Sequence, residues 1–149
     1  MKYTTKDKSC INKMVRLFFV TLLFILTQNM CFGQEFRDCS NILLGKVETN
    51  GTVRDQHNMT IGKFESDGIV RNQQNMTVGK IETDGTIRDR SNVTVGKVES
   101  DGTVRDRSNM MIGKVESGGT VRNRNNMTVG YAKGVPATRA AVFFFFNMF

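Results

Sequence analysis

The residues best equipped for chemistry in this chain of 149 residues are carboxylates and guanidinium groups that recur at a fixed interval. Five glycines lie 17 residues apart, and each has a Glu three positions before it and an Arg three positions after it. Two carboxylates can together hydrolyse a glycosidic bond, whereas evenly spaced charges suit the binding of a repeating polymer such as a glycan. The residues are Glu48, Glu65, Glu82, Glu99 and Glu116, with Arg54, Arg71, Arg88, Arg105 and Arg122.

The equivalence of these positions argues against catalysis, because acid–base catalysis needs carboxyl groups in different environments. The only His, His57, stands where other repeats have Gln, Ser or Asn, which indicates a surface turn residue. We therefore predict a protein that is not an enzyme and has no catalytic residue, cofactor or metal site. The ten charged residues are the candidate binding face, although a solvated ladder of ion pairs explains them more simply.

The repeat that carries these residues predicts a β-hairpin. One copy reads VGKVESDGTVRDRSNMM from Val95 to Met111, with β-branched residues on both sides of a turn sequence. A three-residue loop at 100–102 places Val98 opposite Val104 and puts the charged residues on the other face, whereas a two-residue loop would mix the two kinds on both faces. We therefore predict the three-residue loop, with its Gly in the left-handed conformation.

A second turn follows at Asp106–Asn109, where Asp can bond the backbone two residues on and Asn tolerates a left-handed backbone. Gly113 predicts a bulge that brings Val115 back into phase with the core face. Turn chemistry also explains the Asn-x-Thr triplets at Asn58, Asn75, Asn92 and Asn126 better than glycosylation does. The same parity predicts that Met59, Met76, Val93, Met110 and Met127 face the core and do not bind a soft metal.

A single hairpin cannot bury its apolar face, so neighbouring repeats must stack. We predict an all-β fold, a flower-like or propeller-like radial array of 17-residue hairpins, with an open β-solenoid as the alternative. The half-repeat 36–43 precedes five full repeats at about 44–128, and a closing segment occupies 129–149. Residues 133–139 are predicted as a loop, and the apolar residues 140–149 as a plug or closing strand in the middle of the assembly.

The first 33 residues predict a secretory signal peptide, with basic residues, an apolar run from Leu17 to Leu26 and small residues before a cut at Gln34. A retained anchor is the alternative, and Met14 is an alternative start. Cleavage leaves sixteen Lys and Arg against thirteen Asp and Glu, too weak a basic excess to indicate nucleic acid. It also leaves Cys39 without a disulfide partner. We expect an exported protein that is monomeric and has no membrane span after processing.

The repeat and the Phe-rich C-terminus resemble the small exported bacterial five-fold β-flower proteins. The resemblance rests on the hairpin pattern G-K-[VIF]-E-[ST]-[DN]-G-[TI]-[VI]-R-[DN] and covers about residues 36–149. It implies a radial array of hairpins and no established reaction, so it supplies no catalytic residues.

We therefore predict an exported binding or structural module of unknown partner, with a glycan or an envelope component as the candidate ligand. Two alternatives stay open. One is an accessory subunit that docks on an envelope protein through its Phe-rich C-terminus. The other is a polysaccharide hydrolase with an unrecognised carboxylate pair.

Overall fold

The computed structural model describes residues 33–149, within a compact unit that spans Phe32–Phe149. The predicted signal peptide and the alternative start at Met14 lie outside the described residues, apart from Gly33. Within the described part of the chain, no helix is long and apolar enough to cross a bilayer.

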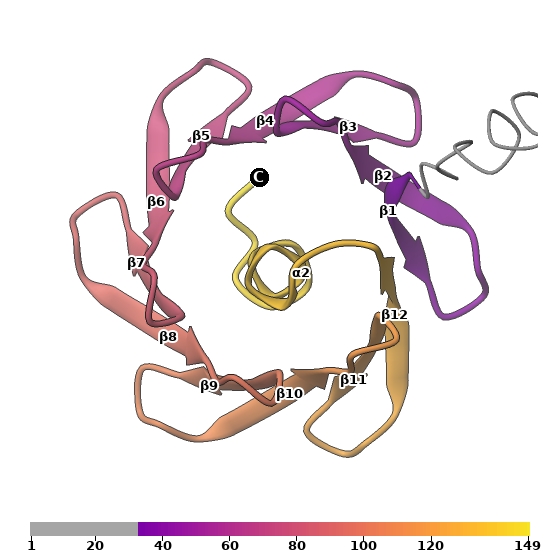
Figure 1. Cartoon of the computed structure of the whole chain (residues 1–149), viewed down its shortest axis with the longest axis vertical. Helices are drawn as coiled ribbons and strands as arrows, with labels where there is room; N and C mark the ends of the chain where they lie inside the picture. The colour runs from indigo at the N-terminus through magenta and orange to yellow at the C-terminus, as the bar shows by residue number, and fades with distance from the viewer. Residues whose placement is uncertain (1–32) are drawn as a thin grey trace, which may run out of the picture. The chain divides into compact units, whose positions relative to one another are not determined.

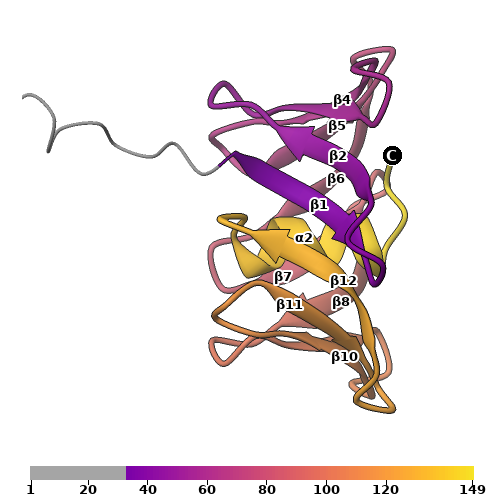
Figure 2. The same cartoon turned by 90° about the vertical axis from the view of Figure 1, so that its right-hand side faces the viewer.

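The described residues form twelve antiparallel strands that close into a barrel around one helix (Figure 1). The helix, α2 (Ala137–Phe144), lies in the middle of the ring, with its axis along the axis of the barrel (Figure 2). The strands are β1 (Gln34–Asp38), β2 (Leu43–Val47), β3 (Thr52–Asp55), β4 (Thr60–Phe64), β5 (Ile69–Asn72), β6 (Thr77–Ile81), β7 (Thr86–Asp89), β8 (Thr94–Val98), β9 (Thr103–Asp106), β10 (Met111–Val115), β11 (Thr120–Asn123) and β12 (Thr128–Lys133).

The ring closes where β1 pairs with β12, Phe36 lying opposite Ala132. This pairing confirms the predicted all-β radial array and excludes the open solenoid. It also corrects the predicted closing strand within residues 140–149, because the half-repeat at the start of the barrel pairs with β12. Closure leaves every strand in the barrel with a neighbour on both sides, so no strand edge is exposed.

The hairpin loops that hold the repeated glycines have the predicted register. Val98 lies opposite Val104 and Lys97 opposite Arg105. The Gly102 N–H donates to the Glu99 carbonyl at 2.9 Å, and Gly102 has a φ of 84°. These loops lie at one end of the barrel, which we call the Gly-turn end. The Gly carbonyl of each loop also accepts a hydrogen bond from the next repeat. For example, the Val115 N–H donates to the Gly102 carbonyl at 2.9 Å.

The opposite end, which we call the Asn-turn end, carries six loops of a second kind. Asn109 has a φ of 63°, and its N–H donates to the Asp106 carbonyl at 3.0 Å. The Asp106 Oδ1 atom accepts the N–H groups of Ser108 at 2.8 Å and Met110 at 3.0 Å, as the sequence predicts. The bulge is also confirmed, because Arg105 pairs with Met111 while Val104 pairs with Gly113, so Ile112 is the extra residue.

The C-terminal segment fills the barrel, but not as a strand. Residues 137–144 are helical, starting with the Ala140 N–H donating to the Pro136 carbonyl at 3.0 Å. Pro136 is tolerated at this position because the first helical N–H groups need no partner within the helix, and the alanines that follow favour a helix. Phe143 stacks on Phe36 with ring centroids 3.9 Å apart. The predicted plug is therefore confirmed, and the predicted closing strand and the loop at 137–139 are wrong.

Candidate functional site

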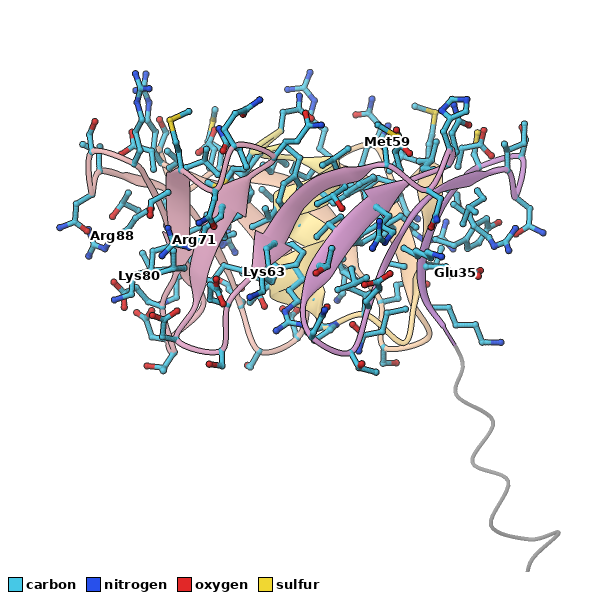
Figure 3. The ribbon with its side chains drawn as sticks, turned by 90° about the horizontal axis from the view of Figure 1, so that it is seen from above. Glu35, Met59, Lys63, Arg71, Lys80 and Arg88 are labelled. Atoms are coloured by element: carbon cyan, nitrogen blue, oxygen red, sulfur yellow. The ribbon has the colours of Figure 1, made fainter. Side chains whose placement is uncertain are left out.

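The ten predicted charged residues lie on the outer wall of the barrel and pair as Glu with Arg across each hairpin. The Nε atom of Arg105 lies 2.7 Å from the Glu99 Oε1 atom. The other four pairs, Glu48 with Arg54, Glu65 with Arg71, Glu82 with Arg88 and Glu116 with Arg122, have separations from 2.6 to 3.4 Å. Figure 3 shows Arg71 and Arg88 on this wall, together with Lys63 and Lys80.

Each arginine is also held at its far side by the neighbouring Asn turn. The Nη1 atom of Arg105 donates to the Asn109 carbonyl at 3.2 Å, and the equivalent contact occurs in all five repeats. The hydrogen bond from Arg105 to Glu99 raises the arginine pKa further, so the guanidinium group stays charged. The guanidinium groups are therefore engaged within the barrel and are not free donors for a ligand.

The wall glutamates repeat at equivalent positions and each pairs with the Arg of its own hairpin, whereas acid–base catalysis uses carboxyl groups in different environments. The exposed Asp84 and Asp101 are the two carboxyl groups with a clear pKa shift among the described residues. The pKa of each is lowered, chiefly by the backbone N–H of Thr86 or Thr103 and then by the same threonine's hydroxyl. A general acid needs the opposite shift, so these carboxylates offer acceptors and not protons.

The largest departure from the sequence prediction concerns the methionines. Met59, Met76, Met110 and Met127, with Val93, were expected in the core, yet all five are more than half exposed. Met110 directly precedes β10, at the Asn-turn end of the barrel. Its carbonyl oxygen accepts the Asp106 N–H. The core ends at the bulge residue Ile112, which packs against buried residues. Met110 lies two residues before Ile112, outside the strand, where no core residue covers it.

These side chains form an apolar ring that we call the rim. Its six members are exposed by 55% to 62% and occupy the same position in all six Asn turns: Ile42, Met59, Met76, Val93, Met110 and Met127. Figure 3 shows Met59 at the end of the barrel, beyond Lys63 and Lys80. Soluble proteins expose single apolar side chains freely, but an exposed apolar side chain at all six equivalent turns makes this end of the barrel the candidate interaction surface. The sequence signal for an exposed position was its place in the turn: each rim residue directly follows the turn Asn and lies four residues after the Asp or Asn that begins the turn.

The charges around the rim divide it into two halves. The first exposed loop position holds Arg90, Arg107 and Arg124 in the three successive turns β7–β8, β9–β10 and β11–β12. In the turns β1–β2, β3–β4 and β5–β6 the same position holds Cys39, Gln56 and Gln73. In the half with the arginines, Asp89 and Asp106 begin two of the three turns. In the other half, Asp38 and Asp55 begin two of the three turns. One half therefore has a net charge of +1 and the other of −2.

A groove of about 410 Å³ opens at the Gly-turn end, between two hairpin loops and the segment that leads from β12 to α2. Asp101, Glu116, Ser117 and Lys133 are among its lining residues. Gly118 stands where three other loops have Asp, and no atom outside its neighbours lies within 4 Å of the place where its side chain would be. The groove is open and lined by both polar and apolar residues, so it is a secondary candidate for a small ligand.

The remaining candidates occupy turn positions at the Asn-turn end. The His57 N–H donates to the Asp55 Oδ1 atom at 2.9 Å, and its imidazole is exposed. Cys39 is an exposed free thiol. Asn58, Asn75, Asn92 and Asn126 all have positive φ, which confirms their predicted turn role. Residues 33–149 contain no group of three or more His, Cys, Asp or Glu side chains that would hold a metal ion.

The inner wall explains the second set of repeated glycines. A side chain at Gly113 would collide with the Arg122 carbonyl oxygen, at 2.5 Å, and with the ring of Phe145. Side chains of the C-terminal segment pack directly against these glycines: Phe144 against Gly130, Phe145 against Gly113, Phe146 against Gly96, Met148 against Gly79 and Phe149 against Gly62. The lumen is thus occupied by the chain itself and is not a binding cavity.

Comparison with known proteins agrees with this architecture. A search of curated proteins and a search of solved structures each found no match. A family model described as 5-fold beta-flower protein matches residues 33–148, which is nearly all of the described barrel. The match and the closed ring of repeated hairpins lead to one conclusion, that this chain belongs to the 5-fold beta-flower protein family.

Proposed function

We propose that this protein is an exported, non-enzymatic binding module that makes its contact through the Asn-turn end of the barrel. The observation that carries the proposal is the rim, six large apolar side chains at equivalent turns that are all more than half exposed. Burying apolar surface contributes about 25 cal/mol per Å², so covering such a ring is a strong driving force for association.

The outer wall supports this proposal because its arginines already donate hydrogen bonds to groups of the same chain. Arg105 bonds both Glu99 and the Asn109 carbonyl, so a glycan hydroxyl would have to displace an existing hydrogen bond. Such an exchange gains little, because a direct hydrogen bond contributes only about 0.5–1.5 kcal/mol net. We therefore rank a glycan-binding wall below the rim. A polysaccharide hydrolase ranks lower still, since the wall glutamates repeat at equivalent positions and the two carboxyl groups with a clear shift, Asp84 and Asp101, have a lowered pKa, opposite to that of a general acid.

Docking through the C-terminus is also less well supported than docking through the rim. Phe143 to Phe146 are only partly exposed and pack against the core from inside the barrel. Removing them to meet a partner would uncover the lumen. The rim is already exposed and needs no rearrangement, so it serves the docking role that the sequence assigned to the Phe-rich segment.

Site-specific photo-crosslinking in the producing cell tests the proposal. A photoreactive amino acid would replace Met110 on the rim or, as a control, the partly exposed Lys80 on the outer wall. We expect adducts from position 110 and none from position 80. Adducts from position 80 alone would contradict the proposal and favour the wall. Recovery of the protein with the envelope or in the medium would test export.

A further inference from the structure

We propose that the Asn-turn face binds the same face of a second copy of this chain, giving a dimer with two-fold symmetry. The Asn-turn face consists of the four consecutive exposed residues of each Asn turn, 39–42, 56–59, 73–76, 90–93, 107–110 and 124–127. The inference rests on the proposed function, because it names the partner of that surface.

The repetition of the rim restricts what can cover it. The same apolar position recurs in six turns around a closed ring, so a partner of irregular shape would cover only some of them. A second copy presents the same ring and can cover all six at once, as an isologous interface does. Methionine suits such a contact, because its flexible thioether adapts to an identical neighbour.

The size of the face matches a stable dimer. Six turns with four exposed residues each supply 24 residues. A standard protein–protein interface uses about 20–30 residues on each side. The face also has the usual composition of such an interface, with an apolar ring and polar loop residues around it.

The charges select a second copy over an anionic bilayer. The face itself carries Arg90, Arg107 and Arg124, but four aspartates (Asp38, Asp55, Asp89 and Asp106) directly precede its loops, so face and flanking residues together have a net charge of −1 and do not attract anionic lipid. Between two copies, however, the half with net charge +1 can lie on the half with net charge −2. A two-fold axis along the boundary between the halves achieves this in both directions simultaneously.

That axis fixes which turns meet. The β9–β10 turn with Arg107 lies on the β3–β4 turn with Asp55 and Gln56 of the other copy. By the same operation, the β11–β12 turn with Arg124 lies on the β1–β2 turn with Asp38. The β7–β8 turn then lies on the β5–β6 turn. Asp55 uses its Oδ1 atom for the turn N–H groups, which leaves lone pairs on Oδ2 for an arginine of the other copy.

Sedimentation velocity on the protein expressed from the full chain, in the processed form that accumulates, tests the dimer. We expect a concentration-dependent dimer that becomes a monomer when Met59, Met76, Met110 and Met127 are all changed to Gln. Lys46, Lys63, Lys80 and Lys114 changed to Gln form the control, with the same number of substitutions on the outer wall and an unchanged dimer. A wild-type monomer at about 100 µM, or a dimer that survives the rim changes, would overturn the proposal.

A charge exchange tests the predicted register. Arg107→Glu should weaken the dimer on the order of tenfold, because a two-fold interface repeats the lost contact. Adding Gln56→Arg, on the turn predicted to face it, should restore the affinity. Adding Gln73→Arg on the next turn should not. Equal rescue by both, or by neither, would overturn the register.

The two proposals fail in different ways. A wild-type monomer whose position 110 still crosslinks to another protein would leave the proposed docking function intact and exclude the second copy as the partner. Crosslinks from the outer wall alone would exclude the docking function itself. Crosslinks from position 110 to the same chain would support both.

Discussion

The seating of the C-terminal segment on the glycines of the inner wall gives a prediction that one pair of substitutions can test. Gly113→Ala and Gly45→Ala are a matched pair. In each, the new methyl group would lie 2.5 Å from a backbone carbonyl oxygen, that of Arg122 or of Arg54. Only at Gly113 does it also collide with an aromatic ring of the plug, that of Phe145.

The expected magnitudes follow from these contacts. Forcing a methyl group against a backbone carbonyl in a packed wall costs about 1–3 kcal/mol, and both variants share this loss. At Gly113 the half-buried Phe145 must also leave its seat. Complete loss of a buried Phe costs about 3–5 kcal/mol, so partial displacement adds about 1–2 kcal/mol. For a domain of this size we expect Gly113→Ala to melt about 4–8 °C below Gly45→Ala.

Thermal and urea unfolding followed by circular dichroism measures the difference, with Gly118→Ala as the control. No atom outside its neighbours lies within 4 Å of the Gly118 side-chain position, so that variant should melt within a degree or two of the wild type. Phe145→Ala combined with Gly113→Ala should destabilise less than the sum of the two single changes. Equal melting temperatures for the Gly45 and Gly113 variants would refute the seating of the plug on these glycines.

Three further predictions concern the turns and the wall. Asn109→Ala should destabilise the barrel by about 1 kcal/mol and Asn109→Gly far less, because the residue has a φ of 63°; equal losses in urea unfolding would contradict this. Asp101→Asn should lower stability at neutral pH. Because the folded-state pKa of Asp101 is lowered, its contribution is full above the ordinary value of 3.8 and is lost as the pH falls through the folded value, so unfolding at successive pH values should show the gap to wild type closing in acid. Arg105→Gln should cost at most about 1 kcal/mol, since its partner Glu99 is solvent-accessible, and a double-mutant cycle with Glu99→Gln measures the pair.

The hairpins were predictable because their register has a single self-consistent solution. A loop at 100–102 is the one that places Val98 opposite Val104 and leaves Lys97 with Arg105, and the structure has this pairing. The turn residues carried the same information, since Gly102 and Asn109 are types that accept positive φ. Closure of the ring followed from the half-repeat at the start, which needs a neighbour on its free edge.

Two features of the C-terminus and the rim were not predictable from local pattern alone. A run of phenylalanines has no period, so it does not distinguish a buried strand from a buried helix. Pro136 and the alanines after it favour a helix, but the prediction placed Pro136 in a loop and the apolar run in a plug or closing strand. The placement of Met110 failed differently, because parity gives the face of a residue but not whether the core extends far enough along the strand to cover it.

The distribution of contacts around the barrel supports the Asn-turn end as the proposed binding surface. The lumen holds α2 and the aromatic tail, the wall arginines bond Glu and backbone carbonyls within the chain, and each Gly turn is tied to the next repeat. At the Asn-turn end the repeat places an apolar side chain where no core reaches it, and it does so six times. Six identical turns would give a face without a preferred orientation. The arginines at 90, 107 and 124 divide the face into two unlike halves, so that a two-fold pairing of the face with itself can place each half on the half of opposite charge.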